Sequence, residues 1–445
     1  MRRSSLFGHT AELLDLVLTS RQPADILARQ FFRDRRYLGA RDRRFIADRL
    51  YDILRHHDRL VFLLGRALAE VSAAAPRGEM PAIGLCAAHA VHVTGERPET
   101  LLPDVEGIWR TVSYDIDPSL LLQALAGVEM PRDFPGPADR LALLYSMPKF
   151  ILLEWLERYG EAEVEALCAA SNAPAPTVLR VNPLRGDREA CRRALALEGV
   201  PSRPGLLAPE ALVLEKRCNL PGLRAYREGW IEVQDEGSQL IGVLLQARPG
   251  ERIVDACAGG GGKTLHLAAM MENRGSILSL DVAEERLKSL ERRAVRAGVS
   301  IAEVRVTTPD GGPGAAWVES ADGVLVDAPC SGTGTLRRNP GAKLHLSAER
   351  VASQQRVQEE IVREGARYVR PGGRLLYSTC SLLRSENEKV VEGFLASRGD
   401  FRLLPSIHLL REKGVPVEGD DLMLTLLPHR HGTDGFFAAL MERSA

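Results

Sequence analysis

Two cysteines in this chain follow predicted strands in a pattern that can do chemistry on a pyrimidine ring. Cys330 comes shortly after residues 323–327, in Asp-Ala-Pro-Cys-Ser-Gly, and Cys380 comes shortly after residues 374–378, in Tyr-Ser-Thr-Cys-Ser. A pyrimidine ring is too electron-poor to be methylated on carbon until a nucleophile has added to it, and a thiolate can be that nucleophile. The pair therefore predicts that one thiolate adds to the ring and that the second helps it to leave.

The surroundings of both cysteines favour reactive thiols over the commoner alternative, a small buried hydrophobic side chain. Each lies among Ser, Thr or Gly at the carboxyl end of a strand, where a helix N-terminus can lower the pKa of a reachable thiol below ~8.5. Lys263 is expected to favour the thiolate, and Asp327 to donate a proton to the ring nitrogen beside the attacked carbon. The candidate catalytic residues are Cys380, Cys330, Asp327 and Lys263.

A glycine-rich turn at residues 255–264, Asp-Ala-Cys-Ala-Gly-Gly-Gly-Gly-Lys-Thr, lets the backbone pass close to a ligand. A phosphate-binding loop would need glycine five positions before Gly262, where Cys257 stands. A dinucleotide fingerprint that starts at Gly259 would need glycine where Thr264 stands. With both motifs excluded, the glycine-rich turn predicts a nucleoside cofactor that has no pyrophosphate.

Two aspartates follow later strands at positions suited to that cofactor. Asp281 ends the second strand, 22 residues after Gly259, where a carboxylate can accept hydrogen bonds from ribose hydroxyls. The alternative for Asp281 is a solvated strand end or a helix N-cap. Asp310 follows the third strand and is expected near the adenine amino group, although an ordinary turn explains it almost as well.

The last part of the chain alternates strands and amphipathic helices, which predicts a Rossmann-like α/β domain with a parallel sheet covered on both faces. Its predicted strands are 252–256, 276–281, 303–307, 323–327 and 374–378. Its clearest predicted helices are 283–297 and 349–369. Residues 422–427 and 435–441 are expected to close the domain as an antiparallel pair.

Two further domains are expected to precede this one. Residues 1–135 show apolar residues every three or four positions, which predicts an all-helical domain that ends in a Pro- and Gly-rich linker. Residues 140–243 predict a small α+β module with a helix near 151–170 and strands at 177–182 and 230–235. The catalytic domain is then 244–445.

Composition narrows the class of protein. The 445 residues carry a formal net charge of −1 and include 45% hydrophobic residues, as in a chain of more than one compact domain. The seven cysteines are scattered and include no metal-binding spacing, so we expect free thiols, no metal and a cytoplasmic location. No apolar run is long enough to span a bilayer, and nothing in the sequence demands association, so a monomer is expected.

Basic residues are concentrated near the start of the chain. Residues 29–59 contain ten arginines and five aspartates, a net charge of +5. An Arg-rich helix face is usually a solvated surface, but planar guanidinium groups also suit phosphates and bases. The cluster is a modest indication of RNA binding.

Several ordered segments resemble those of the RNA 5-methylcytosine methyltransferases of the Fmu/Sun type, which modify bacterial rRNA. The segments are 255–264, 327–334, 337–340, 377–381 and 386–387. Residues 1–135 resemble the NusB-like domain of that family, 179–183 its middle RNA-binding module and 434–437 its closing strand. The chain departs from the family at Gly259-Gly260, where Ala-Pro is usual, and at Gly341, where an aspartate is usual.

The resemblance implies a site and a substrate. It makes Cys380 the nucleophile, gives Cys330 a role in release of the methylated base, and implies S-adenosylmethionine as cofactor and small-subunit rRNA as partner. The implied cofactor ligands are Cys257, Ala258, Gly259, Gly260, Gly261, Gly262, Lys263, Asp281, Arg286, Asp310 and Asp327. The implied RNA ligands are Arg180, Asn182, Arg337 and Arg338.

Other functions fit parts of this pattern. A methyltransferase for a small molecule or a protein would keep the cofactor site and use the cysteines structurally. An RNA-binding ribosome assembly factor with a decayed site is disfavoured, because Cys330, Cys380, Asp327 and Lys263 are all present. The N-terminal domain can also be a protein-interaction module, which is compatible with the enzyme interpretation.

Overall fold

A computed structural model describes residues 1–71, 80–111, 116–307, 315–419 and 422–445. The chain forms two compact units, each described by itself below. The helical unit comprises Met1–Pro174 and Leu336–Ser347, and the sheet unit comprises Ala175–Thr335 and Ala348–Ala445. None of the helices in the described ranges combines the length and the apolar character needed to span a bilayer.

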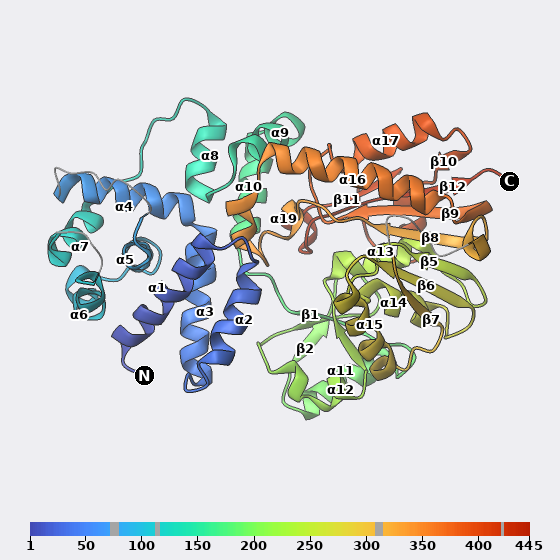
Figure 1. Ribbon diagram of the computed structural model, residues 1–445, viewed down its shortest axis with the longest axis horizontal. Helices are drawn as coiled ribbons and strands as arrows, with labels where there is room; N and C mark the ends of the chain where they lie inside the picture. The colour runs from blue at the N-terminus through green and yellow to red at the C-terminus, as the bar shows by residue number, and fades with distance from the viewer. Residues whose placement is uncertain (72–79, 112–115, 308–314, 420–421) are drawn as a thin grey trace. The chain divides into compact units, whose positions relative to one another are not determined.

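The helical unit is built around α5 (Ala82–His92), which contacts α1, α3, α4, α6 and α7 (Figure 1). Its small residues allow this close packing, since even a Cβ at Gly84 would lie 2.8 Å from Leu64. The other helices are α1 (Arg3–Thr19), α2 (Ala24–Asp34), α3 (Ala40–Arg55), α4 (His57–Val71), α6 (Pro98–Trp109), α7 (Pro118–Gly127), α8 (Pro137–Tyr145), α9 (Lys149–Tyr159) and α10 (Glu161–Asn172). The predicted all-helical start is confirmed, and its form is consistent with a NusB-like domain.

Two details of this unit test the sequence-based expectations. The predicted break in helical structure is confirmed, since α7 ends at Gly127 and α8 begins at Pro137. The helical stretch expected near 151–170 is confirmed, and it consists of two separate helices, α9 and α10. Gly160, with φ +79°, lies between them in a left-handed conformation that ends a helix.

The sheet unit begins with a four-stranded antiparallel sheet in the order β2-β3-β1-β4, and we call residues 175–233 the four-stranded module. Its strands are β1 (Val178–Val181), β2 (Ser202–Pro204), β3 (Ala211–Leu214) and β4 (Ile231–Val233). Helices α11 (Arg188–Leu197) and α12 (Arg224–Arg227) belong to the same module. Leu179, Leu212 and Ile231 are fully buried in its core. The predicted strands at 177–182 and 230–235 are confirmed as neighbours in this sheet.

The rest of the unit is an eight-stranded mixed sheet in the order β10-β12-β9-β8-β5-β6-β7, with β11 paired to β12. Its parallel strands are β5 (Arg252–Asp255), β6 (Ser276–Asp281), β7 (Ala302–Val306), β8 (Ala321–Asp327) and β9 (Val369–Thr379). The antiparallel strands are β10 (Phe401–Leu403), β11 (Met423–Leu426) and β12 (Phe436–Arg443). All five predicted parallel strands and the closing antiparallel pair are confirmed.

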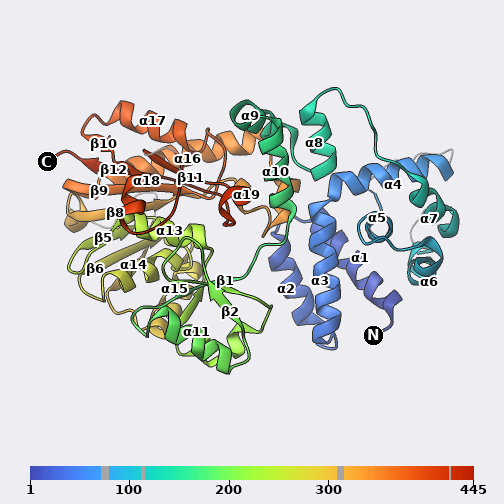
Figure 2. The ribbon, with the colours of Figure 1, turned by 180° about the vertical axis from the view of Figure 1, so that it is seen from behind.

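Helices cover both faces of this sheet, as the Rossmann-like prediction requires (Figures 1 and 2). One face carries α13 (Glu236–Leu245), α14 (Gly262–Met270), α15 (Glu284–Ala297) and α18 (Ser406–Glu412); the other carries α16 (Ala348–Ala366) and α17 (Glu388–Ser397). Neighbouring strand residues alternate between the two cores, as Ile253 and Val254 do. The helix predicted to reach Val369 ends earlier, because that residue already pairs with Ala321 in the sheet.

Candidate functional site

The two predicted thiols meet at the carboxyl edge of the large sheet. Strands β8 and β9 are parallel neighbours, with Asp327 opposite Ser378, so the loops that follow them leave the sheet side by side. Cys330 and Cys380 lie on these two loops with their Sγ atoms 3.2 Å apart, and both are free thiols. Each is partly exposed, so a ligand can reach them.

A buried carboxylate holds the loop that carries Cys330. Glu386 accepts hydrogen bonds from the main-chain N–H of Ser331, at 2.8 Å, and from the Ser331 hydroxyl. Gln358, from α16, donates to both Glu386, at 3.0 Å, and the carbonyl of Pro329, at 2.9 Å. The Glu386-Asn387 segment therefore has a structural function that reasoning about charge and nucleophiles did not assign.

The loop that carries Cys380 is fixed in a similar way. Asn387 accepts from the Thr379 hydroxyl at 2.6 Å and donates to the Ser381 carbonyl at 3.0 Å, so it brackets the cysteine on both sides. The N–H of Gly334 donates to the carbonyl of Cys380 at 2.9 Å and joins the two loops directly. The thiols therefore sit on two loops that are bonded to each other.

The thiol of Cys330 is affected by its surroundings. The hydrogen bond with the Cys380 thiol, together with desolvation, raises the pKa of the Cys330 thiol well above its ordinary value. Cys330 therefore keeps its proton at neutral pH. A protonated thiol next to a second sulfur can donate a hydrogen bond to that sulfur.

An ion pair lies at the ends of the strands that precede the thiol loops. Lys263 Nζ is 2.5 Å from Asp327 Oδ2, and the Ser378 hydroxyl donates to Asp327 Oδ1 at 3.0 Å. The Lys263 side chain is 10% exposed and that of Asp327 is 28% exposed. Lys263, which was expected beside a thiol, therefore bonds to Asp327. The pair places one donor group and one acceptor group at the edge of the sheet.

The glycine-rich turn forms the neighbouring part of the edge, between β5 and α14. The N–H of Gly259 donates to Asp281 Oδ2 at 2.9 Å, and the N–H of Ala283 donates to Asp281 Oδ1 at 2.8 Å. The predicted proximity of the turn and this aspartate is therefore present. Gly261 has φ +84°, and a Cβ there would lie 2.4 Å from the Leu290 side chain, so glycine is required at this position.

The turn has the shape and the groups that a nucleoside cofactor needs. Among the described residues, and apart from chain neighbours and the backbone of α14 itself, only Asp281 Oδ2 would come within 4.0 Å of a Cβ at Gly259, and no atom would come that close to a Cβ at Gly262. A ligand can therefore approach the backbone beside a carboxylate that still has acceptor capacity. The N-terminus of α14, which begins at Gly262, adds main-chain donors to the same place.

The remaining predicted cofactor residues have mixed outcomes. Ala258 is buried in the turn, whereas Arg286 is exposed on α15. Desolvation raises the pKa of the Cys257 thiol far above its ordinary value, which makes it an inert thiol. Asp310 lies outside the described residues.

Asp255, at the end of β5, is a residue of this site to which the sequence analysis gave no role. It is fully buried and accepts a hydrogen bond from the Thr264 hydroxyl at 2.7 Å, so it joins the two ends of the glycine-rich turn. Burial raises its pKa to about 6. The sequence feature that could have identified Asp255 is its position at the end of a predicted strand, directly before the glycine-rich turn.

The four predicted RNA ligands lie in two different environments. Arg180 and Asn182 are buried in the four-stranded module and bond to main-chain carbonyls of the sheet unit, so the structure does not support their contact with RNA. Arg337 and Arg338 belong to the helical unit, in the segment Leu336–Ser347. Arg337 is buried, and its carbonyl accepts from Arg55 at 3.4 Å, whereas Arg338 is exposed.

The arginine cluster near the start of the chain is partly structural. Arg49 pairs with Glu96 at 2.7 Å, with 11% of its side chain exposed, and Arg55 pairs with Asp52 at 2.9 Å, with 9% exposed. Arg44 is 68% exposed on α3. The surface available to a phosphate backbone is therefore smaller than the count of charges suggested.

Comparison with known proteins adds a family to this geometry. The sequence model described as "16S rRNA methyltransferase RsmB/F" matches residues 242–442, and the model of an RsmF/B-like ferredoxin-like domain matches residues 147–221. A Bacillus subtilis protein named "Probable ribosomal RNA small subunit methyltransferase B" is 36% identical over 312 residues, which cover 69% of this chain and 68% of that protein.

Two further relatives agree with these matches. The ribosomal RNA small subunit methyltransferase B of Pseudomonas syringae is 33% identical over 317 residues, which cover 69% of this chain and 67% of that protein. The solved structure of the protein PH0851 superposes with a TM-score of 0.80 at 27% identity, and the match covers 100% of this chain and 99% of that one.

Proposed function

Since the chain belongs to the RsmB/F family of 16S rRNA methyltransferases, we propose that it methylates carbon 5 of a cytosine in small-subunit rRNA through a covalent cysteine adduct. S-adenosylmethionine-dependent methylation of rRNA is the activity of the family, and the resemblance found in the sequence motifs is confirmed. The observation that carries the finer proposal is the 3.2 Å separation of two thiols beside the Lys263–Asp327 pair.

The proposed reaction begins with a bond between Cys380 Sγ and carbon 6 of the cytosine. Asp327, paired with Lys263, supports the ring nitrogen while charge develops on the ring. Carbon 5 becomes nucleophilic and would take the methyl group of bound S-adenosylmethionine, whose sulfur would keep the electrons of the broken carbon–sulfur bond and leave as a neutral thioether. A base then takes the proton from carbon 5, and the bond to sulfur breaks as the ring double bond returns.

Cys330 is proposed to assist the last step. Its raised pKa keeps a proton on its sulfur at neutral pH, 3.2 Å from the sulfur that must leave carbon 6. A hydrogen bond from this thiol stabilises the departing thiolate. The two cysteines thus act in sequence, one in addition and one in release.

The cofactor is proposed to bind along the glycine-rich turn. Asp281 is positioned to accept from ribose hydroxyls, and the backbone of residues 258–263 to lie against the nucleoside. Lys263, at the end of this turn, pairs with Asp327, which ends the strand before the Cys330 loop. The cytosine enters unstacked from its neighbours, because the attack needs access to the face of the ring.

The parts outside the catalytic domain are proposed to bind rRNA in the cytoplasm, with the protein acting as a monomer. The proposed domains are a NusB-like domain at residues 1–135, an RNA-binding module at 140–243 and the catalytic domain at 244–445. Among the predicted RNA ligands, Arg338 is exposed and can donate to phosphates. The buried Arg180 and Asn182 take a different role, which is derived below.

Three forms of the full chain test the proposal: wild type, Cys330→Ala and Cys380→Ala. Each is incubated with small-subunit rRNA and labelled S-adenosylmethionine, followed by denaturing electrophoresis and nucleoside analysis. We expect 5-methylcytosine from wild type, a denaturation-resistant RNA adduct from Cys330→Ala, and neither product from Cys380→Ala. Methylation of cytosine by Cys380→Ala would show that another group is the nucleophile, and label on a different base would exclude a cytosine substrate.

A further inference from the structure

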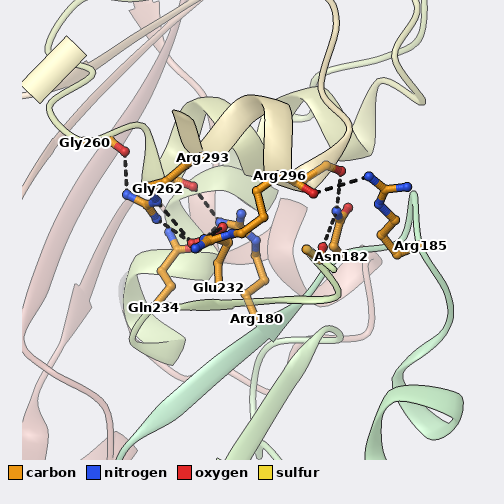
Figure 3. Close-up of polar contacts among 11 residues, drawn as sticks. Arg180, Asn182, Arg185, Glu232, Gln234, Gly260, Gly262, Arg293 and Arg296 are labelled. Carbon is orange, nitrogen blue, oxygen red and sulfur yellow. Dashed lines mark hydrogen bonds and ion pairs between the residues drawn. The ribbon is translucent and has the colours of Figure 1, made fainter. Parts of the chain in front are cut away.

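We infer that the four-stranded module sets the position of the cofactor turn through two positioning residues, Arg180 and Arg293, which donate to the main-chain carbonyls of Gly262 and Gly260. The inference rests on the proposed role of residues 258–263 as the cofactor turn. Figure 3 shows the contacts within one polar cluster, in which Arg180 bonds to Gly262 and Arg293 bonds to Gly260. The module then contributes to cofactor binding as well as to any contact with RNA.

Arg180 makes the direct link between β1 and the turn. Its Nη1 donates to the Gly262 carbonyl at 2.6 Å and also to the side-chain oxygen of Gln234. Only 2% of Arg180 is exposed, and burial lowers its pKa to about 10, so it stays charged at neutral pH. A buried guanidinium is costly unless its donors are used. Its contact with the turn is therefore a built feature rather than a surface encounter.

Arg293 makes the second link, from α15. Its Nη1 donates to the Gly260 carbonyl, while its Nη2 lies 2.9 Å from Glu232 Oε2. Glu232 is buried on β4, directly opposite Arg180 in the β1–β4 register. The module carboxylate thus orients Arg293, and Arg293 in turn orients the carbonyl of Gly260.

Fixing these two carbonyls fixes the Gly260–Gly261 and Gly262–Lys263 peptide planes. In a trans peptide the N–H points opposite to the carbonyl, so a Gly262 carbonyl held toward Arg180 turns the Lys263 N–H away from it. The same plane precedes the lysine that pairs with Asp327. A change at Arg180 or Arg293 should therefore alter the donors that the turn presents to the cofactor.

Other contacts attach the module to α15 without touching the turn. Asn182 donates to the carbonyl of Ala297 at 2.8 Å, and Arg185 donates to the Arg296 carbonyl at 3.3 Å. Arg296 itself pairs with Glu232 and lies over the Tyr226 ring, 3.9 Å from its centroid. These contacts supply a matched control.

The experiment compares Arg293→Met with Arg296→Met in the full chain. Both residues are on α15 and both variants remove an ion pair with Glu232, but only Arg293 also bonds to the turn. We expect Arg293→Met to raise the Kd of S-adenosylmethionine about tenfold, the loss typical of one charged hydrogen bond, with kcat at saturating cofactor within about threefold of wild type. Arg296→Met should change the Kd by less than about twofold.

Two further measurements separate positioning from a general loss of structure. Hydrogen exchange of the amides of residues 258–264 should speed up in Arg293→Met and stay as in wild type in Arg296→Met. Arg293→Lys, which keeps the charge and one donating nitrogen, should recover part of the affinity. If Arg293→Met does not fold, Arg293→Lys and Arg180→Lys take its place. Their Kd for S-adenosylmethionine should then lie above that of Arg296→Met and below about ten times the wild-type value.

Equal loss of cofactor affinity in Arg293→Met and Arg296→Met would overturn the inference. The proposed cofactor site is tested separately by Asp281→Asn, which should weaken S-adenosylmethionine binding because it removes a charged acceptor. An unchanged Kd in Asp281→Asn means that the turn is not the cofactor site. A raised Kd in Asp281→Asn with no difference between the two arginine variants means that the site is right and the positioning role is wrong.

Discussion

The cysteine loops and the cofactor turn lie at one sheet edge but are held in place in different ways. The cysteine loops are bonded to each other and to residues of their own motifs, through contacts such as Glu386 with Ser331 and Gly334 with Cys380. The cofactor turn depends on residues far away in the chain, Arg180 on β1 and Arg293 on α15. The difference implies that the thiol chemistry and cofactor affinity can be changed separately.

Removal of the nucleophile should produce the largest effect and leave the cofactor turn intact. In Cys380→Ser a hydroxyl replaces the thiol, so we expect the rate of methyl transfer to fall by about a thousandfold or more, because a neutral alcohol is a poor nucleophile. The Kd of S-adenosylmethionine should stay within about twofold of wild type. Single-turnover transfer to rRNA and calorimetric titration measure the two quantities, and a parallel loss of affinity would break the comparison.

Glu386→Gln tests whether the cysteine loops depend on their own local contacts. The carboxylate accepts from Ser331 and Gln358 in a buried position, and an amide there places N–H groups where acceptors are needed, at a cost of about 1–3 kcal/mol. Since the change displaces the loop that carries Cys330, we expect the covalent RNA adduct to break down about tenfold more slowly. A chase of trapped adduct on denaturing gels measures this rate.

The corresponding control is cofactor affinity in the same variant. Glu386→Gln should bind S-adenosylmethionine as wild type does, because Glu386 makes no contact with the turn among the hydrogen bonds of the described residues. A faster adduct breakdown, or a weakened cofactor complex, would contradict the assignment of Glu386 to the Cys330 loop.

Gly261→Ala makes the matching change in the cofactor turn. Gly261 has φ +84°, and the new Cβ would lie 2.4 Å from Leu290, so the turn must shift. We expect the Kd of S-adenosylmethionine to rise about tenfold, with adduct formation at saturating cofactor much less affected. Gly250→Ala is the matched control, because Gly250 has φ +92° and an added Cβ would have no atom of the described residues within 4 Å apart from its chain neighbours. Equal effects on affinity in both variants would attribute the loss to backbone strain alone.

The same contrast explains which parts of the site the sequence could predict. The motifs around Cys330 and Cys380 predicted a thiol pair because parallel neighbouring strands bring their carboxyl ends together, and Asp281 was predicted from its spacing after Gly259. Arg180 could not be placed correctly, because the motif that contains it carries no sign of which face of β1 is buried against the turn. Its contact with Gly262 depends on tertiary packing of segments 82 residues apart.

In the fold, too, features set by local sequence pattern were predicted, and features set by tertiary packing were not. Strands and helices with regular periodicity were predicted within a few residues, whereas the break at Gly160 was missed, because a single glycine within an apolar helical pattern can also be tolerated in a helix. The Arg-rich segment was given only as a modest indication of RNA binding, and local counting could not show that Arg49 and Arg55 are buried in ion pairs.

The smallest expected effect uses pH to separate the two regions. Burial raises the pKa of Asp255 to about 6, above its ordinary value of 3.8, so between these values the folded chain holds a proton that the unfolded chain has lost. The stabilising contribution of this group is therefore complete below about pH 3.8 and is lost as the pH rises through about 6. Asp255→Asn stays neutral throughout and keeps an acceptor for Thr264.

We therefore expect wild type to lose about 1 kcal/mol of unfolding free energy relative to Asp255→Asn between pH 5 and pH 7, measured by urea denaturation. The difference in unfolding free energy between wild type and Cys330→Ala should be the same at pH 5 and pH 7, because the raised pKa of Cys330 keeps its thiol protonated at both pH values. A constant difference between wild type and Asp255→Asn would mean that Asp255 is ionised in the folded protein at pH 5. A pH-dependent difference in the Cys330 pair would mean that the thiol loops titrate with the turn, and the two regions would then be one electrostatic unit.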